Sequence, residues 1–288
     1  MKLIATDLDG TLLSKNHEIS DANKEALKLA SEQGVEIIVA TGRSYSAAKI
    51  PLDKAGLNFP IICLNGGKIY NERAQLLNSA PLDKATCKKI KQICTAQHVY
   101  FEVFTNKATF SESREKFIQV MVDIMASAFP QLTREEVEAQ AKNRFQDEEV
   151  EIIDNFDQLF DREDIDVYKI LAFSLDDEVL EQVEQNLKDD ASIAITSSGF
   201  SNLEFNHPKA QKGIAVKEFA AQLGIEMKDV MAIGDNFNDA SMIEMAGYGV
   251  AMGNAAEAIK DMADFTTKTN HEDGVAHAIQ TLLSKELS

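Results

Sequence analysis

The stretch KLIATDLDGTL, residues 2–12, joins a short apolar run to two aspartates one residue apart, Asp7 and Asp9. Apolar runs of this kind are usually strands that are buried on both faces of a parallel sheet. In open α/β sheets the ligand binds beyond the carboxyl ends of the strands. The stretch therefore predicts a strand that presents both carboxylates at the binding edge of a sheet, although Asp and Gly are also ordinary residues of a surface turn.

Two further apolar runs in the N-terminal part also end in small polar residues. Residues 35–40 (VEIIVA) lead into TGR at 41–43, and residues 61–64 (IICL) lead into NGG at 65–67. Helical segments lie between the runs, and strand–helix–strand units of this spacing form parallel sheets with right-handed crossovers. Three strands are thus expected to end at one edge, which brings their polar residues together.

The same pattern resumes in the C-terminal part of the chain. A helix is expected from about residue 213, directly after Lys212. An apolar run at 230–233 then leads into the sequence GDNFND at 234–239. A fourth strand is therefore expected to end in carboxylates at the same edge as the first.

Residues 83–206 have a different character, because their expected strands come in adjacent pairs, which favours antiparallel pairing. We therefore expect an α/β fold with a Rossmann-like parallel-sheet core, formed by residues 1–82 and 207–288, and an inserted α+β cap domain between them. The acidic tract at 147–166 is interpreted as a solvated face with loops. Two helices of the insert are expected at 114–128 and 134–144.

The side chains brought to the predicted edge are mainly carboxylates, with one lysine and one threonine: Asp7, Asp9, Thr41, Lys212, Asp235 and Asp239. Carboxylates about 4 Å apart repel by ~4 kcal/mol at an effective dielectric constant of about 20, so a proton, a lysine or a cation must neutralise them. An all-oxygen set suits Mg²⁺, and the scattered histidines do not indicate zinc. Magnesium, lysine, threonine and backbone amides together would bind phosphate. Each segment alone also fits a plain turn or helix start; the functional interpretation depends on their occurring together.

Composition limits the partners. The 47 acidic and 29 basic residues give a formal charge of −18, which repels nucleic acid and anionic membrane surfaces. Cys63, Cys87 and Cys94 lack metal-binding spacing and fit reduced thiols. The sequence has neither the charged-then-apolar pattern of a signal peptide at its start nor an apolar run of membrane-spanning length. A cytoplasmic protein, monomeric or homodimeric, with no nucleic-acid or membrane partner is therefore expected.

Four motifs at these positions resemble those of the haloacid dehalogenase superfamily of phosphatases. DLDGTL at 7–12 is similar to the first motif, TGR at 41–43 to the second, Lys212 before a glycine to the third, and GDNFND at 234–239 to the fourth. The insert lies between the second and third motifs, as in the Cof-type branch with a cap of the C2 class. The resemblance covers the whole chain and implies the fold described above.

The resemblance also implies roles for the motif residues. Asp7 would be the nucleophile that forms an aspartyl-phosphate, and Asp9 the general acid and base. Mg²⁺ would be held by the Asp7 carboxylate, the Asp9 backbone carbonyl and Asp235. Asn238 or Asp239 would support the metal, directly or through water.

Thr41, Gly42 and Lys212 would hold the phosphoryl group. Lys209 could compete for the role of Lys212, which is preferred because Gly213 and the helix start follow it directly. Residues on the substrate side are expected both in the core motifs and in the cap strand that leads back to the core. The candidates are Arg43, Asn65, Gly66, Glu204, Asn206 and His207.

The expected function is that of a Mg²⁺-dependent phosphatase. It would hydrolyse phosphate monoesters of small metabolites, such as sugar phosphates or nucleotide- and cofactor-like phosphates. A phosphomutase or phosphotransferase using the same aspartyl-phosphate, and a non-catalytic phosphometabolite-binding protein, are the alternatives. The sequence does not determine the substrate.

Overall fold

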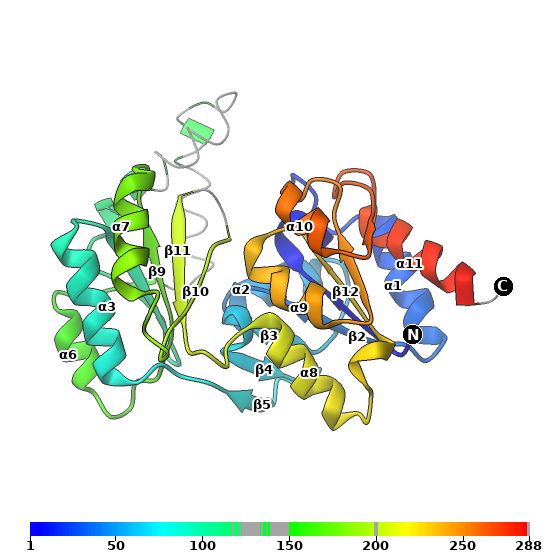
Figure 1. The fold of residues 1–288 in the computed structure, drawn as a ribbon, viewed down its shortest axis with the longest axis horizontal. Helices are drawn as coiled ribbons and strands as arrows, with labels where there is room; N and C mark the ends of the chain where they lie inside the picture. The colour runs from blue at the N-terminus through cyan, green and yellow to red at the C-terminus, as the bar shows by residue number, and fades with distance from the viewer. Residues whose placement is uncertain are drawn as a thin grey trace. The chain divides into compact units, whose positions relative to one another are not determined.

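A computed structural model describes residues 1–116, 118–120, 122, 133, 135–136, 138, 150–198 and 201–286 (Figure 1). The chain divides into two compact units. One, the core unit, consists of Met1–Ser79 and Lys209–Ser288, and the other, the cap unit, of Ala80–Pro208. The domain boundaries expected after residues 82 and 206 stay a prediction. In the part of the chain that the structure describes, no helix is long and apolar enough to cross a membrane.

Among the described residues, the core unit has an eight-stranded sheet of order β14-β13-β12-β1-β2-β3-β4-β5. The strands from β14 to β3 pair in parallel, and only β4 and β5 are antiparallel to their neighbours. The strands are β1 (Leu3–Thr6), β2 (Glu36–Ala40), β3 (Ile61–Cys63), β4 (Lys68–Tyr70), β5 (Leu76–Ser79), β12 (Val230–Gly234), β13 (Tyr248–Ala251) and β14 (Phe265–Thr266).

Strand β1 lies in the middle of this sheet, with β2 on one side and β12 on the other. All of its residues have no exposed surface, as expected for a strand with both faces covered. The helices of the core unit are α1 (Asp21–Glu32), α2 (Tyr45–Lys54), α8 (Lys212–Gln222), α9 (Ala240–Met245), α10 (Glu257–Met262) and α11 (Gly274–Glu286). The predicted α/β fold with a parallel core sheet is therefore confirmed.

A tight irregular turn follows β1 at Leu8–Leu12. Gly10 has φ +76° there, a left-handed conformation that glycine adopts at little cost, and a β-carbon at this position would overlap the Asp235 carboxylate. The Leu13 amide donates to the Leu8 carbonyl at 2.8 Å and closes the turn. Leu13 then bridges to Ile19, so the chain folds back in a short hairpin before α1.

The cap unit has, among its described residues, a sheet of order β10-β11-β9-β6-β7-β8. Its helices pack on one face of the sheet over an apolar cluster that includes Cys87, Leu159 and Val183 (Figure 1). The strands are β6 (Tyr100–Thr105), β7 (Thr109–Ser111), β8 (Val150–Ile152), β9 (Val167–Phe173), β10 (Ala194–Thr196) and β11 (Asn202–Asn206), and the helices are α3 (Lys84–Ala96), α6 (Phe156–Asp161) and α7 (Asp177–Leu187). The expected α+β character is confirmed.

Two expectations for the cap unit need correction. The acidic tract at 147–166 is not only a solvated face, because it contains β8 and α6, and Phe156 and Phe160 of α6 are buried. Pairing is also not wholly antiparallel, since β7 and β8 run parallel. The segment folds as a helix because the apolar side chains of α6 pack into the core of the cap unit, although acidic residues lie between them in the sequence. The helices expected at 114–128 and 134–144 lie largely outside the described residues.

Helix α8 crosses α9 so closely that its second residue must be glycine. A β-carbon at Gly213 would overlap the backbone carbonyl of Ser241, and the Gly213 amide donates to the Ser241 hydroxyl at 3.0 Å. This close crossing places the first residue of α8, Lys212, against the sheet edge.

Replacing Gly213 with alanine should therefore lower stability, because the two helices must move apart. We expect a loss of about 1–3 kcal/mol in the free energy of unfolding, as for other overpacked sites. Urea denaturation followed by circular dichroism measures it. Gln222→Ala, on the exposed part of α8, is the matched control and should change stability by less than about 0.5 kcal/mol. Equal stability of Gly213→Ala and wild type would contradict the close crossing.

Candidate active site

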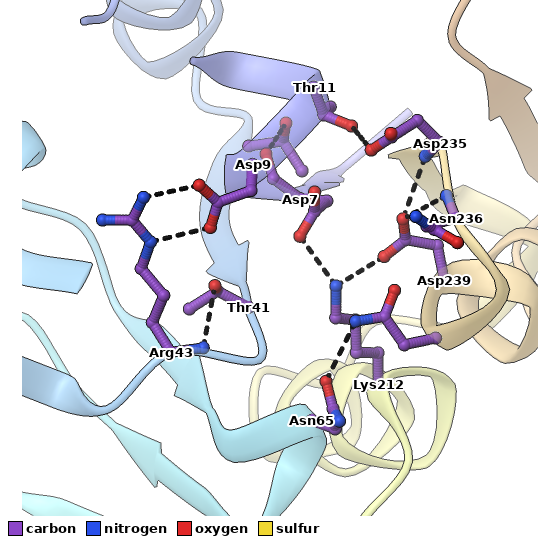
Figure 2. A network of polar contacts seen from close by, with 12 residues as sticks. Asp7, Asp9, Thr11, Thr41, Arg43, Asn65, Lys212, Asp235, Asn236 and Asp239 are labelled. Atoms are coloured by element: carbon purple, nitrogen blue, oxygen red, sulfur yellow. Dashed lines mark hydrogen bonds and ion pairs between the residues drawn. The ribbon is translucent and has the colours of Figure 1, made fainter. Parts of the chain in front are cut away.

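The polar residues that follow β1, β2 and β12 lie at one edge of the core sheet (Figure 2). Asp7, Thr41 and Asp235 each come directly after a strand, and parallel neighbours end at the same edge. Lys212 reaches this edge from the start of α8. The structure thus brings together the core residues that the sequence analysis selected.

Lys212 binds two buried carboxylates at once. Its ammonium nitrogen lies 2.7 Å from Asp7 Oδ1 and 2.6 Å from Asp239 Oδ1. Burial lowers the pKa of Lys212, but the charges of Asp239 and Asp7 raise it by more, so the lysine is held in its charged form. Lys209, the competing lysine, is exposed. The geometry therefore favours Lys212 as the cation of this site.

Asp7 lies close to three other carboxylates. Burial raises its pKa well above the ordinary value, and the charge of Asp239 raises it further, while Lys212 acts in the opposite direction. Burial, followed by the charge of Asp239, also raises the pKa of Asp235 to about 7. The Thr11 hydroxyl donates to Asp235 Oδ1 at 2.9 Å and partly stabilises the ionised form. The site thus holds more negative charge than its single lysine neutralises.

Asp239 organises the loop after β12. Its Oδ1 accepts from Lys212, and its Oδ2 accepts from the backbone amides of Asp235 and Asn236 at 2.9 and 3.0 Å. Asp239 has no exposed surface. Both of its oxygens are therefore engaged by protein donors, which fits a supporting position better than a direct metal ligand.

The donor set fits a divalent cation. Carboxylate oxygens of Asp7, Asp235 and the supporting Asp239 lie within 4.8 Å of one another. Oxygen-only ligands of this charge are those that Mg²⁺ and similar hard cations prefer. A cation here would also relieve the repulsion that raises the pKa of Asp7 and Asp235.

Asp9 projects from the turn after β1 and pairs with Arg43. Arg43 Nε donates to Asp9 Oδ2 at 2.7 Å, and Nη2 donates to Oδ1, which makes a two-pronged pair (Figure 2). Desolvation raises the pKa of Asp9, but the charge and hydrogen bonds of Arg43 lower it by more. The Asp9 side chain keeps 48% of its surface exposed, so it remains accessible. The sequence analysis missed this pair; the adjacency of β1 and β2 could have indicated it.

Thr41 and Asn65 are buried at the ends of β2 and β3. Thr41 Oγ1 accepts from the Arg43 amide at 3.2 Å, and Gly42 lies between these two residues. Asn65 adopts φ +59°, and its side-chain oxygen accepts from Asn238 Nδ2 at 3.2 Å. The Asn65 contact links the loop after β3 to the loop after β12.

Close packing explains why position 66 is glycine, which the sequence did not reveal. It has φ +107°, and a β-carbon there would lie 2.8 Å from the Gln211 carbonyl oxygen. Only glycine therefore lets this loop approach the residue that precedes Lys212.

Glu204 and Asn206 belong to β11 of the cap unit, where both are buried. Glu204 Oε1 lies 3.0 Å from the ammonium nitrogen of Lys169, and Asn206 Nδ2 donates to the Tyr168 carbonyl at 2.9 Å. Both side chains therefore have polar partners within the cap sheet. His207 is half-buried directly after β11. A substrate role for these three residues stays a prediction.

The sequence matches the profile of haloacid dehalogenase-like hydrolases over residues 4–279. The chain belongs to this family. The predicted family and the expectation of a hydrolase are confirmed.

Relatives within the family match along nearly their whole length. The chain is 37% identical over 285 residues to Phosphatase YwpJ of Bacillus subtilis, covering 98% of this chain and 100% of the relative. It is 38% identical over 285 residues to the 5-amino-6-(5-phospho-D-ribitylamino)uracil phosphatase YwtE of the same organism, covering 99% of each. A solved haloacid dehalogenase-like hydrolase from B. subtilis superposes with a TM-score of 0.90 at 37% identity, covering 98% of this chain and 100% of that one.

The raised pKa of Asp235 predicts a pH dependence of the metal-free enzyme. The folded state holds this proton up to about pH 7, whereas the unfolded state, with the ordinary value of 3.8, releases it earlier. Folding stability in EDTA should therefore fall as the pH rises through this interval. Asp235→Asn keeps an oxygen for Thr11 and cannot ionise. It should be more stable than wild type at pH 8 in urea denaturation, with the gain shrinking toward pH 4; lower stability at pH 8 would count against the repulsion.

Adding a divalent metal should stabilise wild type but not Asp235→Asn. A cation that binds only the folded state stabilises it by about 2.7 kcal/mol at 100 times its dissociation constant. Adding Mg²⁺ after EDTA treatment should raise the melting temperature of wild type and leave Asp235→Asn nearly unchanged. Asp53→Asn, whose exposed side chain pairs with Lys49 on α2, is the control and should respond like wild type. A full response of Asp235→Asn would exclude Asp235 as a ligand.

Proposed function

We propose that this chain is a Mg²⁺-dependent phosphatase that hydrolyses phosphate monoesters of small metabolites through an aspartyl-phosphate on Asp7. One observation supports this most strongly: a buried carboxylate at the end of the central strand lies 2.7 Å from a buried lysine, next to a second carboxylate, Asp235. A nucleophile, a fixed positive charge and a cation-binding set then adjoin one point, which is what phosphoryl transfer requires.

In the first step, an oxygen of Asp7 attacks phosphorus. The new bond joins this oxygen to phosphorus, and the bond from phosphorus to the ester oxygen breaks. Asp9 gives its proton to the departing ester oxygen, which leaves as an alcohol. Lys212 holds the attacking carboxylate in place and offsets the charge of the phosphoryl group.

In the second step, a water oxygen attacks the phosphorus of the aspartyl-phosphate, the bond from phosphorus to the Asp7 oxygen breaks, and Asp9 takes the proton that the water loses. Inorganic phosphate leaves and the Asp7 carboxylate is restored. Asp9 must alternate between its two protonation states, and its surroundings pull its pKa in both directions. Arg43 lowers the pKa of Asp9, whereas the negative charge of a bound phosphate raises it.

The Asp7 carboxylate, the Asp9 backbone carbonyl and Asp235 are the proposed ligands of Mg²⁺, with Asn238 and Asp239 in support. When bound, the ion supplies charge neutralisation and Lewis acidity at the phosphoryl oxygens. Thr41, at the end of β2 with Gly42 after it, is proposed to bind the phosphoryl group together with Lys212.

The substrate is proposed to be a small phosphorylated metabolite. The relative YwtE is named for a substrate in which a ribityl chain carries the phosphate, which supports a polyol or sugar phosphate for this chain as well. In the core unit, Arg43, Asn65 and Gly66 are proposed to lie on the side of the departing alcohol; Glu204 and Asn206 of the cap unit stay candidates for substrate contact.

Asp7→Asn tests the nucleophile. Amide nitrogen cannot form the phosphorylated intermediate, so release of phosphate from sugar phosphates and from p-nitrophenyl phosphate should fall by at least about 10³-fold, a size seen when other catalytic nucleophiles are removed. Circular dichroism shows whether the variant folds. Substantial turnover by folded Asp7→Asn would refute the assignment.

Asp9→Asn tests the proposed role of Asp9 as general acid and base. With p-nitrophenyl phosphate, whose alcohol leaves without help, this variant should form the intermediate and hydrolyse it slowly, so that intact-mass spectrometry detects a phosphoryl group on Asp7.

If wild type forms an isomeric sugar phosphate without releasing phosphate, the enzyme is a phosphomutase and the hydrolase proposal fails.

A further inference from the structure

Two asparagines from the C-terminal part of the core unit hold the turn that carries Asp9. Asn254 Nδ2 donates to the Gly10 carbonyl at 2.8 Å, and Asn270 Nδ2 donates to the Leu13 carbonyl at 2.8 Å. The Asn270 backbone amide donates to Asn254 Oδ1 at 2.9 Å and joins the two. We call these three hydrogen bonds the asparagine clasp.

Sheet topology places the clasp at the site edge. Asn254 follows β13 and Asn270 follows β14, and both strands run parallel to β12 and β1. Their following loops therefore reach the same edge as Asp7 and Asp9. The two loops are joined to each other as well, since the Gly253 amide donates to the Lys268 carbonyl at 3.0 Å.

The backbone partners determine which way the Asn254 amide points. The Asn270 N–H can only donate and the Gly10 carbonyl can only accept, so Oδ1 must face the former and Nδ2 the latter. Serine or threonine would be too short to span both, and aspartate would place an oxygen against the Gly10 carbonyl. Of these four side chains, only asparagine makes both hydrogen bonds, and it does so in one orientation.

The clasp acts on the turn that the Leu13 amide closes by donating to the Leu8 carbonyl at 2.8 Å. Gly10 is left-handed, and its α-carbon lies against the Asp235 carboxylate with no room for a β-carbon. Asn254 holds the same residue through its carbonyl group, and Asn270 holds the end of the turn at Leu13. Asp9 directly precedes Gly10, so its backbone is fixed by these contacts, while its carboxylate remains half exposed and pairs with Arg43.

We propose that Asn254 and Asn270 are positioning residues for Asp9: they hold the turn so that the Asp9 carboxyl meets the departing ester oxygen. This inference rests on the proposed function, in which Asp9 is the general acid. Loss of the clasp should then weaken proton donation without removing the nucleophile. A purely structural role for the clasp would reduce all activities together.

The test compares kcat/KM for two kinds of ester in the Mg²⁺-loaded enzyme. An alkyl ester, such as a sugar or pentitol phosphate, needs protonation of its poor leaving group, whereas p-nitrophenyl phosphate does not. In Asn254→Ala and Asn270→Ala we expect kcat/KM for the alkyl ester to fall about tenfold or more, within the range of general acid catalysis, and that for p-nitrophenyl phosphate to fall by less than about threefold. Asn254→Asp should have the larger effect, since it adds repulsion at Gly10.

The double variant shows whether the two asparagines act together. Because one hydrogen-bonded unit is removed, its alkyl-to-aryl ratio should equal that of Asn254→Ala rather than the product of the single effects. Asn58→Ala is the matched control: it also loses a side-chain amide bond to a backbone carbonyl, that of Glu72, in the core unit. Its ratio should stay at the wild-type value.

Asp9→Ala separates the two proposals. If Asp9→Ala lowers the alkyl-to-aryl ratio and the asparagine variants do not, the clasp proposal is wrong and the role of Asp9 stands. If Asp9→Ala lowers both activities equally, the general-acid role itself fails. An equal fall for both esters in the asparagine variants, with a lower melting temperature, would assign the clasp to stability alone.

Discussion

The Lys212 ammonium group between the Asp7 and Asp239 carboxylates is the interaction on which the site depends. All three side chains are almost fully buried. Removing such charges from water costs several kcal/mol for each ion, and only close pairing with further hydrogen bonds offsets that cost. These bonds join β1, α8 and the loop after β12, so they connect the two separate stretches of chain that form the core unit.

Excess negative charge distinguishes this arrangement from a structural ion pair. Asp239 accepts from Lys212 and two backbone amides. Among the described residues, Asp235 beside it makes no ion pair with a lysine or arginine. The protein thus holds two carboxylates in a state that favours uptake of a proton or a divalent ion. Such stored repulsion is common at functional sites and is a reason to place the chemistry here.

The sequence predicted the core sheet and its site well, because the relevant signals are local. Apolar runs mark the strands, and parallel strands carry the polar residues after them to one edge. The cap unit was harder: α6 lies in an acidic tract and is revealed only by the way Phe156 and Phe160 pack. The direction of β8 could not be read from spacing, since short strands of either direction look alike.

By itself, the sequence determined the family, the order of the core strands along the chain, and which carboxylates, lysine and threonine follow them. Only the tertiary structure decided how these groups pair: Lys212 with Asp7 and Asp239, and Arg43 with Asp9. It also revealed the asparagine clasp, in which Asn254 reaches Gly10. The physical reason is that these contacts join residues from different elements, from 27 to 244 positions apart in the chain, so they depend on how whole elements pack, and no local sequence pattern records that packing.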